Sequence, residues 1–155
     1  MYLVQHAEAT RKDEDSSRPL SEKGWKDIRN VARFVEKTSS IHVAQIVHSG
    51  KLRAKQTADI LAEQLHPDKG VIAAEGLEPM ADPKIWKRNL DKIAEDIMTV
   101  GHLPHLSRLV GYLITGDENK DVIAFRMGGI VSLKRNEADR WMVQWVITPE
   151  IIPQA

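Results

Sequence analysis

Short apolar runs alternate with amphipathic segments of helical period along most of the chain, and this alternation limits the possible folds more than any other feature. Compact apolar runs occupy residues 1–4, 42–47 and 97–100, and a segment with apolar residues three or four apart follows each run. Strands that alternate with helices are typical of βαβ units, whose strands run parallel. We therefore expect a three-layer α/β/α sandwich with a mostly parallel sheet and helices on both faces.

The expected helices begin at residues that commonly start helices. Ser21 is a typical N-cap, and the apolar Leu20 directly before it fits a hydrophobic staple. Pro83 is placed to open a third helix, because a proline in the first turn loses no hydrogen bond. The apolar residues at helical spacing, which we expect to face the core, are Trp25, Ile28, Ala32 and Val35; Ala54, Ala58, Leu61 and Leu65; Trp86, Leu90, Ile93 and Ala94; and Leu106, Leu109, Val110 and Leu113.

Further strands are expected in the middle and towards the end of the chain. A short strand is predicted at 71–74, and runs of β-branched and aromatic residues predict three more, at 122–125, 130–133 and 141–147. The pair Gly128-Gly129 lies between the first two of these three runs. It therefore predicts that they form a hairpin.

Composition favours one domain and excludes several kinds of site. A chain of 155 residues, 42% of them hydrophobic, is long enough for a single domain with its own core, spanning 1–155. Lys and Arg together number 22, as do Asp and Glu, and this zero net charge gives no support to a nucleic-acid or membrane-surface partner. The absence of cysteine excludes disulfides, thiolate metal sites and a cysteine nucleophile. Since neither a spanning segment nor a signal-peptide pattern is seen, a cytoplasmic location is expected.

Three chemically useful side chains follow strands of the expected sheet. His6 comes after the first strand, Arg53 soon after the second, and His102 after the strand that ends at Val100. Ligands of open α/β sheets bind beyond the carboxyl ends of the strands. If these strands are parallel, two imidazoles and a guanidinium lie at one edge of the sheet. That combination is suited to accepting a phosphoryl group.

Several short motifs occur in a recognisable order along the chain. They are Leu-Val-Gln-His-Ala-Glu-Ala at 3–9, Arg-Pro-Leu-Ser-Glu-Lys-Gly at 18–24, Ser-Gly-Lys-Leu-Arg-Ala-Lys-Gln-Thr-Ala at 49–58, Gly-His-Leu-Pro at 101–104, and the late Gly128-Gly129. With these motifs the chain resembles the histidine phosphatase superfamily, which has the phosphoglycerate mutase-like fold. Within that superfamily it is similar to the small SixA-type phosphohistidine phosphatases, over nearly its whole length.

The resemblance implies a role for four residues. His6 matches the family's nucleophile, which attacks phosphorus in line and becomes phosphorylated before water releases the phosphate. Arg53 matches a phosphate-binding arginine, and His102 matches the second histidine, which stabilises the charge of the transition state. Arg18 resembles an additional phosphate or substrate contact of the SixA-type branch. The family's reaction uses no metal or organic cofactor, so none is expected.

The chain departs from the family pattern at Gln5. The family has an arginine directly before its nucleophilic histidine, whereas an amide brings no charge. Loss of that charged contact is expected to cost about 2–4 kcal/mol of transition-state stabilisation, by analogy with removal of an oxyanion-hole donor. The nearby Arg11 or Lys12 is a candidate to replace the charge. The other departure is Gly50, where the family usually has a proline.

The general acid and the substrate are less well defined by the sequence. Mutase and phosphomonoesterase branches carry a glutamate in the middle of the chain, and Glu78 is the candidate here, with Glu75 near it. A phosphorus–nitrogen bond needs less help from an acid than an alkyl ester does. The resemblance favours a phosphohistidine-bearing protein as substrate, such as a phosphotransfer domain. A small phosphomonoesterase and a non-catalytic module that binds a phosphorylated ligand are the alternatives.

Structural explanations remain open for each of these residues. A lone histidine at a strand end is often an ordinary hydrogen-bonded polar residue, and Arg18 is also compatible with a surface ion pair. No pair of histidines has the helical spacing and neighbouring carboxylate typical of zinc sites, so no metal is expected. We expect the remaining histidines to be structural or exposed, and the tryptophans to belong to the core; they are His42, His48, His66 and His105, and Trp25, Trp86, Trp141 and Trp145.

Overall fold

A computed structural model describes residues 1–39 and 41–154. The strands in this part of the chain are β1 (Tyr2–Gln5), β2 (Gln45–His48), β3 (Val71–Ala73), β4 (Ile97–Gly101), β5 (Ile130–Arg135) and β6 (Trp141–Ile147). The helices are α1 (Glu22–Thr38), α2 (Leu52–Leu65), α3 (Pro83–Asp91) and α4 (His105–Thr115), followed by the 3₁₀ turn η1 (Pro149–Ile151). No helix within the described residues is long and apolar enough to cross a membrane.

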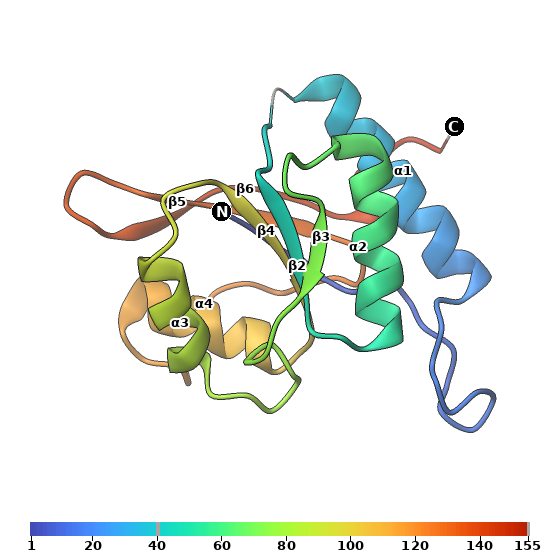
Figure 1. Ribbon diagram of the computed structural model, residues 1–155, viewed down its shortest axis with the longest axis horizontal. Coiled ribbons are helices and arrows are strands. Elements are labelled where there is room, and N and C mark those ends of the chain that lie inside the picture. Colours follow the sequence, from blue (N-terminus) through green and yellow to red (C-terminus); the bar gives the residue numbers. More distant parts are fainter. Residues whose placement is uncertain (40, 155) are drawn as a thin grey trace.

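The strands form one six-stranded sheet in the order β3-β2-β4-β1-β5-β6. The four strands from β3 to β1 pair in parallel, and β5 and β6 complete the sheet by antiparallel pairing. Helices α1 and α2 cover one face of the sheet and α3 and α4 cover the other (Figure 1). The predicted three-layer α/β/α sandwich with a mostly parallel sheet is confirmed.

Each face of the sheet has its own apolar core. Successive side chains of a strand point to opposite faces, so Leu3 and Val4 of β1 are both fully buried but in different cores. Val4 packs with residues of α1 and α2, such as Ile28 and Leu61. Leu3 packs with α3 and α4, including Trp86. Burial on both faces explains why the parallel strands are continuous apolar runs in the sequence.

The helix starts are confirmed at the two predicted positions. Ser21 has an extended backbone, and its side chain accepts a hydrogen bond of 3.0 Å from the backbone N–H of Gly24. Pro83 is the first residue of α3, behind Asp82, whose carboxylate accepts from the backbone N–H of Lys84 at 3.0 Å. These caps satisfy backbone donors that a helix leaves free in its first turn.

The prediction of a strand at 122–125 is wrong, and so is the hairpin built on it. The segment has no regular backbone structure, and the hairpin of the structure joins β5 to β6. Ile123 and Phe125 pack against the core under α3 and α4, so alternate burial imitated the period of a strand. Gly128 donates its N–H to the carbonyl of Gln5 at 2.9 Å, which ties the glycine pair to the end of β1 instead of to a neighbouring strand.

The start of β2 and the end of α3 also differ from the prediction. Strand β2 begins at Gln45, three residues later than expected. Helix α3 ends at Asp91, because Lys92 turns its N–H back to the carbonyls of Asn89 and Leu90. Ile93, which was expected on the buried face of this helix, therefore lies beyond its end and is exposed, as is Ala94.

A close approach between α1 and the segment after β1 predicts the effect of Gly24→Ala. A Cβ atom at position 24 would lie 2.0 Å from the carbonyl oxygen of Glu8, so the backbone must shift. In an unconstrained helix, alanine stabilises the helix by about 1 kcal/mol relative to glycine. Overpacking of the new methyl group against the backbone, however, costs about 1–3 kcal/mol of stability. We expect Gly24→Ala to lower the free energy of unfolding in urea titrations.

The matched control is Gly101→Ala. Its Cβ atom would meet nothing nearer than Leu106 at 3.5 Å, an ordinary van der Waals contact. Gly101→Ala should therefore be nearly neutral for stability. A Gly24→Ala protein at least as stable as the unmodified protein would contradict the close approach.

Candidate active site

His6 lies at the carboxyl end of β1 with its ring in a fixed orientation. Its backbone N–H donates to the carbonyl of Gly101 at 3.0 Å, which extends the β1–β4 pairing by one residue. The ring nitrogen Nδ1 lies 2.7 Å from the carbonyl oxygen of Ala7. A carbonyl can only accept, so Nδ1 must carry the proton. In a neutral ring, Nε2 is then left with a free lone pair, which a nucleophile requires.

The surroundings of His6 favour its neutral form. The pKa of His6 is lowered to about 4, chiefly by burial and to a smaller extent by the positive charges of Arg53 and Arg18, whereas the hydrogen bond to Ala7 acts in the opposite direction. At neutral pH the imidazole is therefore uncharged. Its nucleophilic nitrogen is available without the removal of a proton.

His102 faces His6 across the site. The ring centroids of the two imidazoles are 5.1 Å apart, with 52° between the ring planes. Nε2 of His102 lies 2.6 Å from the hydroxyl of Ser49, and its buried Nδ1 has no partner among the described residues. The pKa of His102 is lowered to about 3, chiefly by burial, with smaller contributions from His6, Arg53 and other basic neighbours. Both imidazoles are therefore neutral at neutral pH.

Arg53 enters the site from the first turn of α2. Its Nε is buried without a hydrogen-bond partner, and burial followed by repulsion from Arg18 lowers the pKa of its guanidinium. An arginine still keeps its charge under these conditions. The side chain of Thr57 donates to the carbonyl of Arg53 at 2.8 Å and accepts the N–H of Ala7 at 3.0 Å. This relay holds the start of α2 against the segment that carries His6.

Arg18 reaches the same region from the loop between β1 and α1. Its φ of 50° is unusual for a residue with a side chain, and its Nε donates to the carbonyl of Thr10 at 3.1 Å. The following Leu20 donates its N–H to the amide oxygen of Gln56 at 2.8 Å, which ties this loop to α2. Because Arg18 acts on the pKa of both His6 and Arg53, its charge belongs to the cluster.

Gln5 lies beside this cluster, in a hollow of its own. Its side chain lines a depression of about 250 Å³ together with Leu103, and its buried amide oxygen has no hydrogen-bond donor in the described structure. Gln5 and Leu103 directly precede His6 and directly follow His102 in the chain, but neither histidine lines this depression. The two loop cations considered as replacements for the missing charge, Arg11 and Lys12, are both exposed, and Arg11 is paired with Asp13 and with Glu14.

Glu78 is bound to its own turn. Its carboxylate accepts the N–H of Gly76 at 3.0 Å, and the side chain is exposed. Glu78 acts on the pKa of His105 but is not among the groups that shift the pKa of His6 or His102. The geometry brings His6, Arg53, His102 and Arg18 together, and it gives Glu78 a local structural contact instead.

Some residues that organise the site were not singled out from the sequence. Ser49, Gln56 and Thr57 stood in a recognised motif, but their partners are up to 53 residues away in the chain, and no local pattern reveals such contacts. His105 is fully buried behind the site, and neither of its ring nitrogens has a partner among the described residues. His42, by contrast, is exposed.

The chemistry of the cluster is that of an anion site. Within residues 1–39 and 41–154 no group of three or more histidine, aspartate or glutamate side chains is placed to hold a metal ion. A larger hollow, of about 450 Å³, lies instead at the other end of β1 and β4, where Met1 and Ile97 line it. Size therefore does not locate the site. The two imidazoles and two guanidinium groups do.

Comparison with known proteins agrees with this geometry. The pattern of the histidine phosphatase superfamily (branch 1) matches residues 1–96, more than half of the chain. The chain belongs to the histidine phosphatase superfamily. It is also 31% identical over 146 residues to an uncharacterized protein of Picosynechococcus sp., covering 89% of this chain and 86% of that protein.

Solved structures of the superfamily share the fold. The protein histidine phosphatase SixA complexed with tungstate has a TM-score of 0.81 and 22% sequence identity, covering 96% of each chain. A putative alpha-ribazole-5'-P phosphatase from Escherichia coli has a TM-score of 0.79 and 13% identity, covering 96% of this chain and 95% of that one. The phosphoglycerate mutase-like fold is confirmed. Membership of the histidine phosphatase superfamily indicates a phosphatase.

The three buried imidazoles predict that stability falls as the solution is acidified. The pKa values of His6, His102 and His105 are lowered to about 4, 3 and 4, whereas in an unfolded chain histidines titrate near about 6.5. Between those limits the unfolded chain binds more protons than the folded one. The free energy of unfolding therefore decreases as the pH falls from about 6.5 to about 4.

His105→Leu isolates one of the three contributions. Leucine has a similar volume and no polar atom, so the variant should be as stable as the unmodified protein near neutral pH. In urea titrations at pH about 7.5 and about 5, it should lose less stability on acidification. An equally steep loss would contradict the assignment of His105 as a buried neutral imidazole.

Proposed function

We propose that this protein is a phosphatase that hydrolyses its substrate through a phosphohistidine formed at Nε2 of His6. The lone pair of Nε2 attacks phosphorus, and the bond from phosphorus to the leaving group breaks with its electron pair on that group. Water then attacks the phosphohistidine and releases inorganic phosphate, which restores the neutral imidazole. The observation that carries the proposal is the contact between Nδ1 of His6 and the carbonyl of Ala7, which leaves Nε2 free.

Arg53, Arg18 and His102 would bind and stabilise the phosphoryl oxygens. The two guanidinium groups offer several N–H donors and a charge that persists at neutral pH. His102 is neutral while the site is empty, but a bound phosphoryl dianion would raise its pKa and favour its protonated form. Protonated His102 would then donate to a phosphoryl oxygen as negative charge develops in the transition state.

The proposed substrate is a protein that carries phosphohistidine, such as a phosphotransfer domain. Phosphohistidine has an imidazole leaving group, which accepts a proton readily and depends little on a carboxylic acid. No carboxylate is among the groups that shift the pKa of His6 or His102, which fits such a substrate better than a phosphate ester. The similarity to SixA supports the same class.

Gln5 supports a second candidate function. The residue before His6 has no charge, and its amide oxygen has no donor in the described structure. A site that binds a phosphorylated ligand but transfers its phosphoryl group slowly or not at all would have this character. In that case the protein is a binding module for phosphorylated ligands.

Phosphate release distinguishes these functions. The assay uses a phosphohistidine protein and p-nitrophenyl phosphate, with the unmodified protein, His6→Ala and Gln5→Arg. We expect release from the phosphohistidine protein, loss of that release in His6→Ala, and a gain of about 10-fold or more in Gln5→Arg because a charge-assisted contact is added. Acid-labile phosphate on the unmodified protein, absent from His6→Ala, would identify the intermediate.

Other outcomes select the alternatives. Faster release from p-nitrophenyl phosphate than from the phosphohistidine protein would favour a small phosphomonoesterase. No release by the unmodified protein, with release by Gln5→Arg, would favour the binding module. Release that persists in His6→Ala would exclude His6 as the nucleophile.

Glu78→Gln tests the need for a carboxylic acid. A glutamine at position 78 can still accept the N–H of Gly76, so the local turn should be kept. We expect the rate of phosphohistidine hydrolysis to change by less than about twofold, because the leaving imidazole needs little acid catalysis. A loss of about 100-fold or more, typical of the removal of a general acid, would favour the phosphomonoesterase instead.

A further inference from the structure

The hollow beside the imidazole pair contains a cation that no step of the proposed reaction uses. The hollow, of about 250 Å³, is lined by Gln5 and Leu103 next to the two histidines and by Arg126 from the segment before β5. Arg126 is exposed, and its side chain forms no hydrogen bond or ion pair among the described residues. The hollow therefore holds an uncommitted guanidinium that shares its lining with Gln5, although Arg126 is not among the groups that shift the pKa of His6 or His102.

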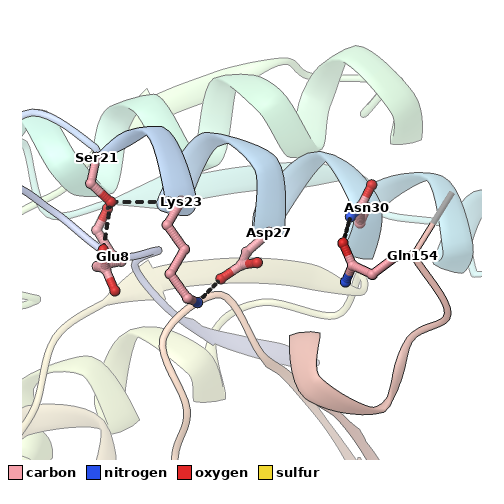
Figure 2. A network of polar contacts seen from close by, with 7 residues as sticks. Glu8, Ser21, Lys23, Asp27, Asn30 and Gln154 are labelled. Atoms are coloured by element: carbon pink, nitrogen blue, oxygen red, sulfur yellow. Dashed lines mark hydrogen bonds and ion pairs between the residues drawn. The ribbon is translucent and has the colours of Figure 1, made fainter.

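The other charged groups that line this hollow are already engaged. Lys23 forms an ion pair with Asp27, and the hydroxyl of Ser21 donates to the carboxylate of Glu8 at 2.8 Å; both contacts are drawn in Figure 2. Lys23 is therefore not free to bind an anion. Of the two cations that line the hollow, Lys23 and Arg126, only Arg126 is without an ion pair among the described residues.

Glu150 is the one carboxylate that competes for Arg126. It lines the same hollow, and no ion pair between the two is formed in the described structure. Hydrogen bonds from its own backbone and from Thr148 lower the pKa of Glu150, with a smaller contribution from Arg126. The carboxylate is therefore ionised at neutral pH, and its charge acts on Arg126 without the two groups forming an ion pair. An arriving phosphoryl dianion carries more charge than this single carboxylate.

The backbone holds Arg126 in a fixed relation to Gln5. Gly128 donates its N–H to the carbonyl of Gln5, and Gly129 donates to the carbonyl of Arg126, both at 2.9 Å. Gly128 has a φ of +77°, and a Cβ atom there would lie 3.8 Å from the Cβ of Ala7. A tight turn thus places the residue that carries the free guanidinium directly against the end of β1.

We propose that Arg126 supplies to the bound phosphoryl group the positive charge that Gln5 does not provide. This inference rests on the proposed function, since it requires a phosphoryl group at His6. The cation enters from the loop before β5 instead of from β1, and its fork of N–H donors meets the phosphoryl oxygens from the side of the hollow. Arg126 is then a phosphate-binding residue that determines how strongly this site holds its substrate.

Binding of tungstate, a tetrahedral dianion that resembles phosphate, tests the inference without requiring turnover. Isothermal titration calorimetry compares the unmodified protein with Arg126→Gln, Arg126→Lys and the control Arg140→Gln. Arg140 is also an exposed arginine, but it lies in the turn between β5 and β6, directly before β6, and does not line the hollow. We expect Arg126→Gln to weaken binding about 10-fold or more, as for loss of a charge-assisted hydrogen bond, and Arg140→Gln to change nothing.

The same titrations in the Gln5→Arg background show whether Arg126 replaces the missing arginine. If it does, Gln5→Arg restores the affinity of Arg126→Gln, and the effect of Arg126→Gln becomes less than about twofold in that background. Arg126→Lys should retain most of the affinity because it keeps the charge. Urea unfolding of each variant verifies that the fold is unchanged.

Three results would overturn the inference. Binding by Arg126→Gln within twofold of the unmodified protein would show that Arg126 does not contact the anion. An equal loss in both backgrounds would show that Arg126 does not substitute for the residue at position 5. If the unmodified protein fails to bind tungstate, the phosphoryl site itself is wrong, and the proposed function falls with the inference.

Discussion

The parallel pairing of β1 with β4 is the constraint on which the candidate site depends. Gln5 is opposite Gly101 in the register, and the N–H of His6 continues the ladder to the carbonyl of Gly101 at 3.0 Å. This pairing puts the next residue of each strand, His6 and His102, at the same height on the edge of the sheet. A shift of the register by one residue would send one imidazole towards the opposite face. The separation of 5.1 Å between the rings is thus a property of the sheet.

The cationic side of the site is added to this edge by contacts between side chains and backbone. Thr57 joins the carbonyl of Arg53 to the N–H of Ala7, and Gln56 joins α2 to the loop that carries Arg18. Both contacts come from adjacent residues on one helix. Because α2 packs on β2, β4 and β3 on one face of the sheet, it is held firmly enough to position two arginines from different segments.

The sequence was sufficient to predict the parts of this arrangement that depend on local patterns. Strand–helix alternation predicted the layers, Ser21 and Pro83 predicted helix starts, and the carboxyl ends of the strands predicted the neighbourhood of His6 and His102. The segment at 122–125 was predicted wrongly because alternate burial of side chains in an irregular segment has the same period as a strand. Contacts between distant segments, such as the one from Gly128 to Gln5, leave no local signal at all.

The distribution of charge explains how a chain without net charge can hold an anion site. Arg53 and Arg18 repel each other, and both lower the pKa of His6, so like charges are held close together in this part of the protein. An arginine at position 5 would add a third cation to a region where both imidazoles are already held neutral by burial. A cation at the exposed rim, such as Arg126, stays hydrated until an anion arrives and adds less repulsion to the empty site. A cation at Arg126 instead of at position 5 therefore adds less repulsion to the folded protein. In the proposed arrangement, the anion still binds a guanidinium next to Gln5.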